Sequence, residues 1–384
     1  MPPLTSDLRD HGPERGAIYR RIGVEPIING ATTMTYLGGS LMPPEVVEAM
    51  RQASECYVDL FELQAAVGRR IAELTRNESA FVTGGASAGL FLSAVVCMAR
   101  DRPDGIVRPG QLDGRPREFL IQHGHRIPYD PAIELAGGRL VEFAPTESAL
   151  DGAIGPDIAG IVVVAGAHLP AGALPLDAVV RAAHARDVLV IVDAAAQLPP
   201  VENLWKFTEG GADLVLFSGG KGLSGPASTG LVLGRTRYIE RFAAHAAPQQ
   251  RIGRPMKVGK EDLIGILAAV EWYLAQDHAA LARRYEASVD HVIAWASSRS
   301  DVSVVREIPG QAGQPTPRAR LTLAPMIAPR RDEILARLRA EPPRIELLPV
   351  SEDGLYLAPE TLVPGEEIVV TRRLADVLEA LWGD

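Results

Sequence analysis

Lys221 and its surroundings carry the first chemical signal in this sequence. The residue lies in the segment SGGKG, directly after an apolar run that predicts a strand over 213–218. Only four of the 39 Lys and Arg residues are lysines, so a lysine between glycines is a candidate for chemistry that arginine cannot perform. Its amine could form a Schiff base with the carbonyl of a substrate or of pyridoxal phosphate. An incidental lysine in a flexible surface loop is the alternative.

Asp193 gives the second signal, because it ends the apolar run VLVIVD at 188–193. An ionised carboxylate at the end of a buried strand is costly unless it meets a positive partner. A protonated pyridine nitrogen is such a partner, and a protonated ring attracts electrons strongly. The alternative is that Asp193 caps a helix beginning at Ala194.

The third signal is the segment ESAFVTGGASAGLFL at 78–92. It predicts a strand, a Gly84-Gly85 turn and a helix that begins near Ala86. The free N–H groups at such a helix start, together with the hydroxyl groups of Thr83 and Ser87, could hold a phosphate. The lysine of a Walker loop and the GxGxxG spacing are both missing, so this segment does not indicate nucleotide binding.

Strand-like and helical segments that could position these residues alternate from about residue 40 to 235. The runs at 160–165 and 188–193 are nearly continuous Val, Ile and Leu, which is typical of strands covered on both faces. We therefore predict an α/β fold with a largely parallel sheet. The predicted strands are 79–83, 119–122, 140–143, 160–165, 188–193, 213–218 and 230–234.

The pattern changes after residue 235. An irregular basic segment is followed by a long helical pattern from 261 to about 298. Beyond it, the chain predicts a small α+β domain, with strands at 318–323, 344–348 and 367–370 and helices at 331–339 and 373–382. We expect an N-terminal arm (1–40), a large domain (41–260) and a small C-terminal domain (261–384).

Composition excludes several classes of protein. The chain has 384 residues, 47% hydrophobic residues and a net charge of −9, which is unsuited to non-specific nucleic-acid binding. Two cysteines cannot build a disulfide framework or a CxxC zinc site, and we expect no metal. Neither a membrane-spanning run nor a signal peptide is visible, so we expect a cytoplasmic protein without a membrane partner.

We call the helix start after Gly84-Gly85 the phosphate cradle. This cradle, the aspartate at the end of a strand and the lysine loop follow one another in the chain in an order that resembles the fold-type-I pyridoxal-phosphate enzymes. Further motifs resemble the branch that contains bacterial selenocysteine synthase (L-seryl-tRNA(Sec) selenium transferase) and its short relatives, such as D-glucosaminate-6-phosphate ammonia-lyase. These motifs are NGATTMTYLG (29–38), DLFELQ (59–64), GHRIPYD (124–130), VDAAAQLPP (192–200), SGGKGLSGP (218–226) and GRPMKVGKE (253–261).

This resemblance implies a seven-stranded, mostly parallel sheet and pyridoxal 5'-phosphate as the cofactor. Lys221 would hold the cofactor as a Schiff base, and Asp193 would pair with the pyridine nitrogen. The other implied cofactor contacts are Gly85, Ala86 and Ser87 at the phosphate, helped by Ser218, and His125 over the ring, with His123 as the second choice. For each histidine, the alternative is a solvated loop position.

Two further elements are expected near the substrate. Arg254, Lys257 and Lys260 form a basic cluster that suits a substrate phosphate or carboxylate, unless the segment is only a solvated connector. His168 follows a predicted strand and would lie at the edge of the site.

We therefore expect a lyase that eliminates ammonia from a small β-hydroxy amino acid or amino sugar acid, with or without a phosphate group. An amino acid racemase or epimerase is the enzymatic alternative, and a non-catalytic pyridoxal-phosphate-binding regulatory protein is the alternative from another class. The family resemblance implies a homodimer or larger homo-oligomer. Because few residues precede the first motif and the net charge is acidic, we do not expect tRNA binding.

Overall fold

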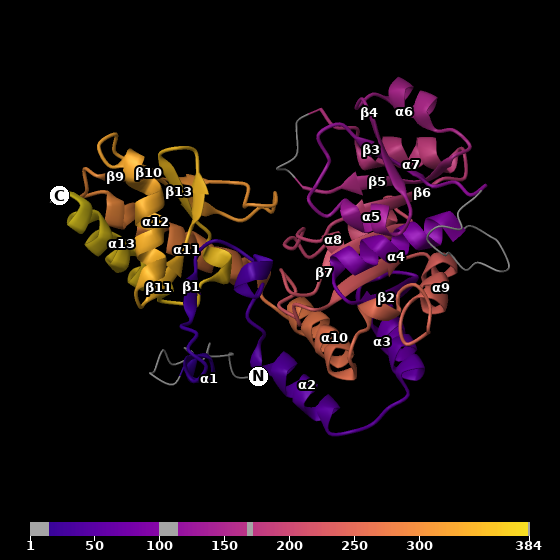
Figure 1. Ribbon diagram of the computed structural model, residues 1–384, viewed down its shortest axis with the longest axis horizontal. Coiled ribbons are helices and arrows are strands. Elements are labelled where there is room, and N and C mark those ends of the chain that lie inside the picture. The colour runs from indigo at the N-terminus through magenta and orange to yellow at the C-terminus, as the bar shows by residue number, and fades with distance from the viewer. Residues whose placement is uncertain (1–14, 100–113, 167–171, 383–384) are drawn as a thin grey trace. The chain divides into compact units, whose positions relative to one another are not determined.

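The computed structural model describes residues 15–99, 114–166 and 172–382. The chain divides into two compact units, shown in Figure 1. The large unit consists of Ser40–Gln276 and Ala312–Gln314. The small unit consists of Met1–Gly39, Asp277–Gln311 and Pro315–Asp384.

A seven-stranded sheet forms the centre of the large unit. In spatial order its strands are β2 (Ser79–Thr83), β8 (Gly230–Gly234), β7 (Leu214–Ser218), β6 (Leu189–Asp193), β5 (Ile158–Val164), β3 (Glu118–Gln122) and β4 (Arg139–Phe143). Strand β8 is antiparallel to both neighbours, and the other six strands run in one direction. The predicted seven-stranded, mostly parallel sheet is therefore confirmed. The carboxyl ends of β2, β6 and β7 lie at the same edge of the sheet.

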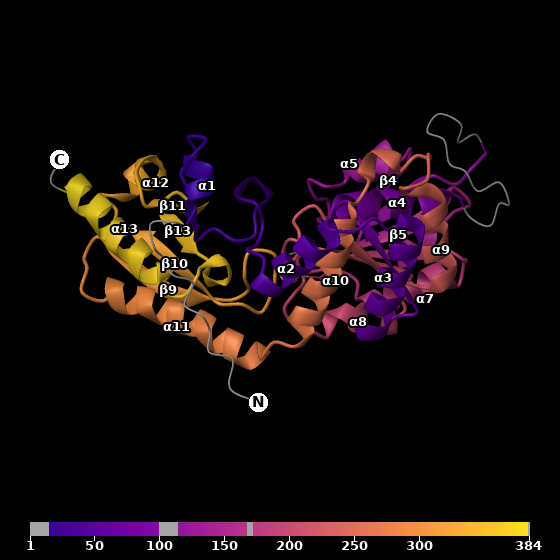
Figure 2. The same cartoon turned by 90° about the horizontal axis from the view of Figure 1, so that it is seen from below.

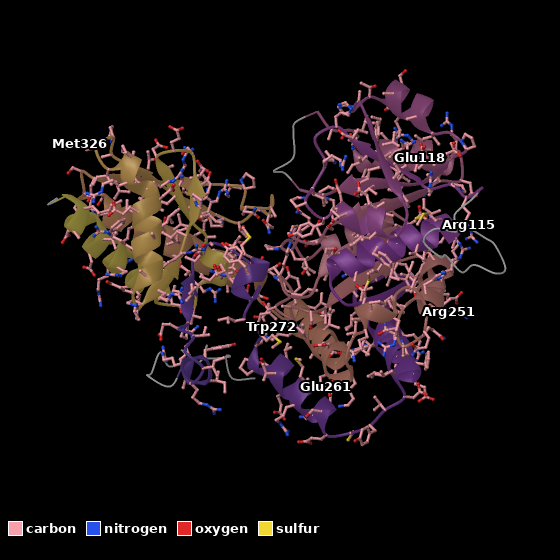
Figure 3. The ribbon with its side chains drawn as sticks, viewed as in Figure 1. Arg115, Glu118, Arg251, Glu261, Trp272 and Met326 are labelled. Carbon is pink, nitrogen blue, oxygen red and sulfur yellow. The ribbon has the colours of Figure 1, made fainter. Side chains whose placement is uncertain are left out.

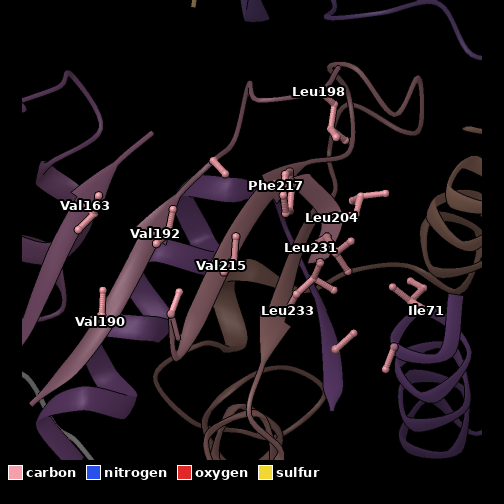
Figure 4. Close-up of a cluster of buried hydrophobic side chains, with 14 of the residues drawn as sticks. Ile71, Val163, Val190, Val192, Leu198, Leu204, Val215, Phe217, Leu231 and Leu233 are labelled. Atoms are coloured by element: carbon pink, nitrogen blue, oxygen red, sulfur yellow. The ribbon is translucent and has the colours of Figure 1, made fainter. Parts of the chain in front are cut away.

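Both faces of this sheet are buried, which explains the continuous apolar runs. Alternate residues enter two separate clusters: Val190, Val192 and Val215 lie on one face, and Ile191, Leu214 and Leu216 on the other. Figure 4 shows the first face.

Helices cover the two faces of the sheet as separate layers. The first face is covered by α3 (Leu60–Leu74), α6 (Glu147–Ala153), α7 (Leu176–His184), α8 (Asn203–Glu209) and α10 (Lys260–Leu274), with α2 (Pro44–Ser54) packed against α10. The second face is covered by α4 (Ala86–Ala99), α5 (Pro131–Leu135) and α9 (Thr236–His245). A layered α/β architecture results, in which the loops that follow the parallel strands lie at the carboxyl edge of the sheet.

A four-stranded antiparallel sheet organises the small unit, with a separate parallel pair beside it. The four strands are, in order, β12 (Leu348–Val350), β13 (Gly354–Leu357), β10 (Arg318–Leu323) and β9 (Val302–Glu307), and the pair is β1 (Ile27–Asn29) with β11 (Arg344–Glu346). Figure 2 shows the helices of this unit: α1 (Ala17–Arg20), α11 (His278–Ala296), α12 (Arg331–Ala340) and α13 (Glu366–Trp382). Helices α11, α12 and α13 contribute to the core of this unit together with alternate residues of β10. The predicted α+β character is confirmed.

Three sequence-based boundaries are wrong. The helical pattern over 261–298 is two helices, because Asp277 accepts the N–H of Ala280 and caps a new helix, α11. The predicted strand at 367–370 belongs to α13, where Val370, Leu374 and Val377 are buried at helical spacing. Helix α10 belongs to the large unit rather than to a domain that begins at 261, because its apolar residues join the core under the seven-stranded sheet.

The described part of the chain lacks two kinds of feature. No helix in this part of the chain is long and apolar enough to cross a membrane. The same residues contain no group of three or more His, Cys, Asp or Glu side chains placed to hold a metal ion.

Candidate active site

Asp193 is buried at the carboxyl end of β6, all of whose residues are buried. Its Oδ1 accepts the N–H of Ala195 at 3.0 Å. Burial raises the pKa of this carboxyl group, while the N–H of Ala195 and the charge of Lys221 lower it. The helix-cap alternative is wrong, since a turn follows Asp193 and the next helix, α8, begins at Asn203.

Lys221 lies in a tightly packed turn after β7. A Cβ atom added to Gly219 would lie 1.9 Å from Oγ1 of Thr229, and one added to Gly222 would lie 2.6 Å from the carbonyl oxygen of Leu198. The glycines are therefore required by packing, which argues against a flexible surface loop. Burial lowers the pKa of the Lys221 amine, and the charge of Asp193 partly opposes that shift. A lysine whose pKa is lowered is neutral more often, and a neutral amine can act as a nucleophile or a base.

The Gly84-Gly85 turn brings a helix start to the same edge of the sheet. Gly85 has a φ of +104°, which favours glycine, and Oγ1 of Thr83 donates to the Gly85 carbonyl oxygen at 2.9 Å. Helix α4 begins at the next residue, Ala86, with Ser87 exposed. The first N–H groups of a helix have no partner within the helix, so this turn is suited to an anion.

Two residues of the predicted basic cluster, Arg254 and Lys257, belong to a segment that packs against this turn. A Cβ atom on Gly84 would lie 3.0 Å from the carbonyl oxygen of Met256, so the segment 254–257 packs against the cradle. Arg254 and Lys257 line a cavity of about 290 Å³ that also includes Thr83. The described lining contains no acidic residue, and it does not include Lys221 or Asp193. Lys260 is directed elsewhere, because its Nζ donates to the Ala53 carbonyl oxygen at 2.6 Å.

The two candidate histidines that the structure describes have different environments. His125 is buried in the loop after β3, and its backbone N–H donates to the Gln122 carbonyl oxygen at 3.0 Å. His123 is exposed in the same loop. His168 lies outside the described residues. Burial makes His125 the better candidate for covering a cofactor ring, and its role stays a prediction.

Comparison with known proteins identifies the family. The aminotransferase class-V family model matches residues 145–254. The chain is 30% identical to the D-glucosaminate-6-phosphate ammonia lyase of Salmonella typhimurium, over 94% of this chain and 98% of the relative. A solved structure of a D-glucosaminate-6-phosphate ammonia-lyase superposes with a TM-score of 0.81 at 29% identity, covering 94% of this chain and 98% of that one. The chain belongs to this family of fold-type-I pyridoxal-phosphate enzymes.

Other members of the family have different names. A 5'-C-glycyluridine monooxygenase-decarboxylase from a Streptomyces species is 33% identical over 94% of this chain and 92% of its own. The L-seryl-tRNA(Sec) selenium transferase of Nitratidesulfovibrio vulgaris is 26% identical over 72% of this chain and 60% of its own. Family membership alone therefore assigns the cofactor, pyridoxal 5'-phosphate, and leaves the reaction to be argued from the site.

The residues present fit this cofactor. A buried amine, a buried carboxylate and a helix-start cradle lie at the carboxyl edge of β7, β6 and β2, and pyridoxal phosphate carries the three matching groups: an aldehyde, a pyridine nitrogen and a phosphate. Ser218, the last residue of β7, lies beside the lysine turn, and its N–H donates to the Ala195 carbonyl oxygen at 3.1 Å.

Tyr129 was not predicted as a site residue, although it lies in the GHRIPYD motif. Its ring centroid lies 6.0 Å from Nζ of Lys221. The neighbouring Asp130 is buried and raises the pKa of Asp193 by charge repulsion. Both residues belong to the loop after β3, which therefore reaches the lysine although 92 positions separate Tyr129 from Lys221.

Proposed function

We propose that the protein is a pyridoxal-phosphate-dependent lyase, acting in the cytoplasm, that eliminates ammonia from a β-hydroxy amino acid or amino sugar acid with an anionic tail. The observation that supports an anionic tail on the substrate is the cavity next to the phosphate cradle, whose described lining contains no acidic residue. Arg254 and Lys257 line it, and no salt bridge to either is found among the described residues. The similarity to the ammonia-lyase of Salmonella typhimurium supports the choice of reaction.

The chain would hold the cofactor by pairing hydrogen-bond donors with its phosphate and a carboxylate with its pyridine nitrogen. The N–H groups of Ala86 and Ser87 would bind the phosphate beside Gly85, whose own N–H donates to the Thr83 carbonyl oxygen at 2.9 Å. The carboxylate of Asp193 would accept the pyridine N–H. When bound, pyridoxal phosphate withdraws electrons from the α-carbon of an amino acid substrate. His125 would cover the ring and restrict its tilt.

Lys221 would take the proton from the α-carbon of the substrate. Burial keeps the pKa of its amine below that of a free lysine, so more of the amine is in the neutral form that can accept a proton. Arg254 and Lys257 would hold a distal phosphate or carboxylate, with Arg254 providing two parallel N–H donors and Lys257 a point charge. Binding energy from this distal group would align the β-hydroxyl group for departure.

Ammonia release tests the proposal directly. The holoenzyme is incubated with D- and L-amino acids that carry a β-hydroxyl group, with and without a phosphate or carboxylate tail, and ammonia and 2-keto acid are measured. Release from the tailed compounds supports the lyase. Loss of optical activity with α-deuterium uptake and no ammonia would establish the racemase or epimerase instead.

An oxygen-dependent decarboxylation is the second candidate, because the Streptomyces monooxygenase-decarboxylase has a comparable identity, 33%, over almost the whole chain. The same incubations are therefore followed with an oxygen electrode and by carbon dioxide release. Oxygen consumption coupled to carbon dioxide release would replace the lyase by this activity.

We also propose that two copies of the chain associate through the start of α3. Tyr57, Val58 and Phe61 are exposed apolar residues in one short segment, and a cavity of about 360 Å³ lies beside Phe61 between α3 and α9. A second copy is the occupant that the family resemblance implies. Light scattering of Phe61→Glu against the wild type tests this: a smaller assembly for the variant supports the interface, and an unchanged mass rejects it.

A further inference from the structure

The sequence RIPYDP at 126–131 builds a rigid turn that presents Tyr129. The Asp130 N–H donates to the Ile127 carbonyl oxygen at 3.1 Å, and Oδ2 of Asp130 accepts the Ile127 N–H at 3.3 Å. The same Oδ2 is bound by Nε of Arg126. Pro128 and Pro131 fix two backbone torsions on either side of Tyr129. The backbone of Tyr129 is thus held before the short helix α5 begins.

This turn places the Tyr129 ring against the lysine of the site. The ring centroid lies 6.0 Å from Nζ of Lys221, which is at the outer limit of a cation–π contact. The Tyr129 side chain is half exposed, so the ring is not simply part of the core. Asp193 is the charged side chain that acts on Lys221, and Asp130 in turn acts on Asp193.

A partner for Lys221 other than Asp193 is needed in the working enzyme. With the cofactor bound, the carboxylate of Asp193 would be engaged by the pyridine nitrogen. Once the Lys221 amine has accepted the α-proton, it is an ammonium group in surroundings where burial disfavours its charge. The negative face of an aromatic ring attracts such a cation without adding a competing base.

We propose that Tyr129 is a positioning residue for Lys221, whose ring faces the amine and stabilises its protonated form. The function of this contact rests on the proposed lyase activity, whereas the contact itself does not. The aromatic ring is the required group, and the hydroxyl group is not.

Titration of the Lys221 amine in the full-length, cofactor-free protein tests this role. The rate at which an amine-specific reagent labels Lys221 is measured against pH by peptide mass spectrometry. Removing the ring in Tyr129→Leu is expected to lower the pKa of the Lys221 amine by about one unit, equivalent to about 1.4 kcal/mol. Tyr129→Phe keeps the ring and is expected to titrate like the wild type. Tyr19→Leu is the control, because Tyr19 is similarly exposed and belongs to the small unit.

The holoenzyme gives a second readout. The pH profile of α-deuterium exchange in Tyr129→Leu should shift in the same direction as the titration, with Tyr129→Phe unchanged. The proposal would be overturned if the Lys221 amine had the same pKa in Tyr129→Leu as in the wild type. It would also be overturned if this pKa shifted equally in Tyr129→Phe. If Tyr129→Leu does not fold, Tyr129→Met replaces it in both measurements. If the pKa of Lys221 shifts in Tyr129→Leu but no amino acid releases ammonia, the role of Tyr129 is supported and the lyase activity is rejected.

Discussion

Gly230 and Gly85 are in such close contact that a Cβ atom on Gly230 would lie 2.3 Å from the carbonyl carbon of Gly85. The first residue of β8 thus packs directly against the backbone of the turn that leads into α4. The atoms in the way are backbone atoms, which cannot rotate aside like the end of a side chain. The shape of the phosphate cradle depends on the absence of a side chain at Gly230.

Gly230→Ala is therefore expected to weaken cofactor binding by about tenfold or more, because relieving the overlap must move the cradle, at a cost of about 1–3 kcal/mol. The measurement is a titration of the apoprotein with pyridoxal phosphate, followed by its visible absorbance. Gly152→Ala in α6 is the matched control, since a Cβ atom there meets nothing within 4 Å. Equal affinities for the two variants would show that the cradle does not bind the phosphate.

Asp193→Asn is expected to keep the cofactor bound and to slow α-proton loss. The amide cannot hold the pyridine nitrogen protonated, and a thousandfold slower exchange corresponds to about 4 kcal/mol. Deuterium exchange at the α-carbon measures this, with the exposed Asp177 replaced in the control variant Asp177→Asn. Near-normal exchange in Asp193→Asn would mean that the carboxylate serves only the turn at Ala195.

Lys221→Met is expected to stabilise the cofactor-free protein near neutral pH. Burial lowers the folded-state pKa of Lys221 below its ordinary value of 10.5, so the unfolded chain binds the proton more tightly. The resulting cost to folding is complete below the folded pKa and vanishes as pH rises towards 10.5. Urea unfolding at pH about 7 and about 10 should show an advantage for Lys221→Met that shrinks with pH, whereas the exposed-site control Lys206→Met should show no such trend. An advantage that grows with pH would contradict the burial of the amine.

The sequence predicts the parts of this site that depend on local pattern. Asp193 ends one uninterrupted apolar strand, and Lys221 follows the end of another by three residues. Both strands are buried on both faces, so the two positions follow from the apolar runs and from the rule that ligands bind at the carboxyl edge of such sheets.

Contacts between distant segments cannot be predicted in this way. The approach of Tyr129 to Lys221 depends on how the loop after β3 folds over the sheet edge, and that of Met256 to Gly84 on an irregular segment without hydrophobic period. The boundary between α10 and α11 could have been predicted, because Asp277 is a recognisable N-cap residue. The continuous helical pattern on both sides of Asp277 obscured it.

Arg254→Ala is expected to raise KM for a substrate with an anionic tail by about 10- to 100-fold, since a charge-assisted hydrogen bond contributes about 1.5–3 kcal/mol. The effect should be absent for an amino acid without the tail, because Arg254 lines the cavity behind the cradle and Lys221 does not. Arg251, labelled in Figure 3, lies in the same basic segment but outside the cavity lining, so Arg251→Ala is the matched control for a general loss of positive charge. Initial rates against concentration for paired substrates separate the two effects. A tail-specific loss in Arg254→Ala alone assigns the cavity to the substrate, and equal losses for both substrates would return the segment 254–257 to a structural role beneath the cofactor phosphate.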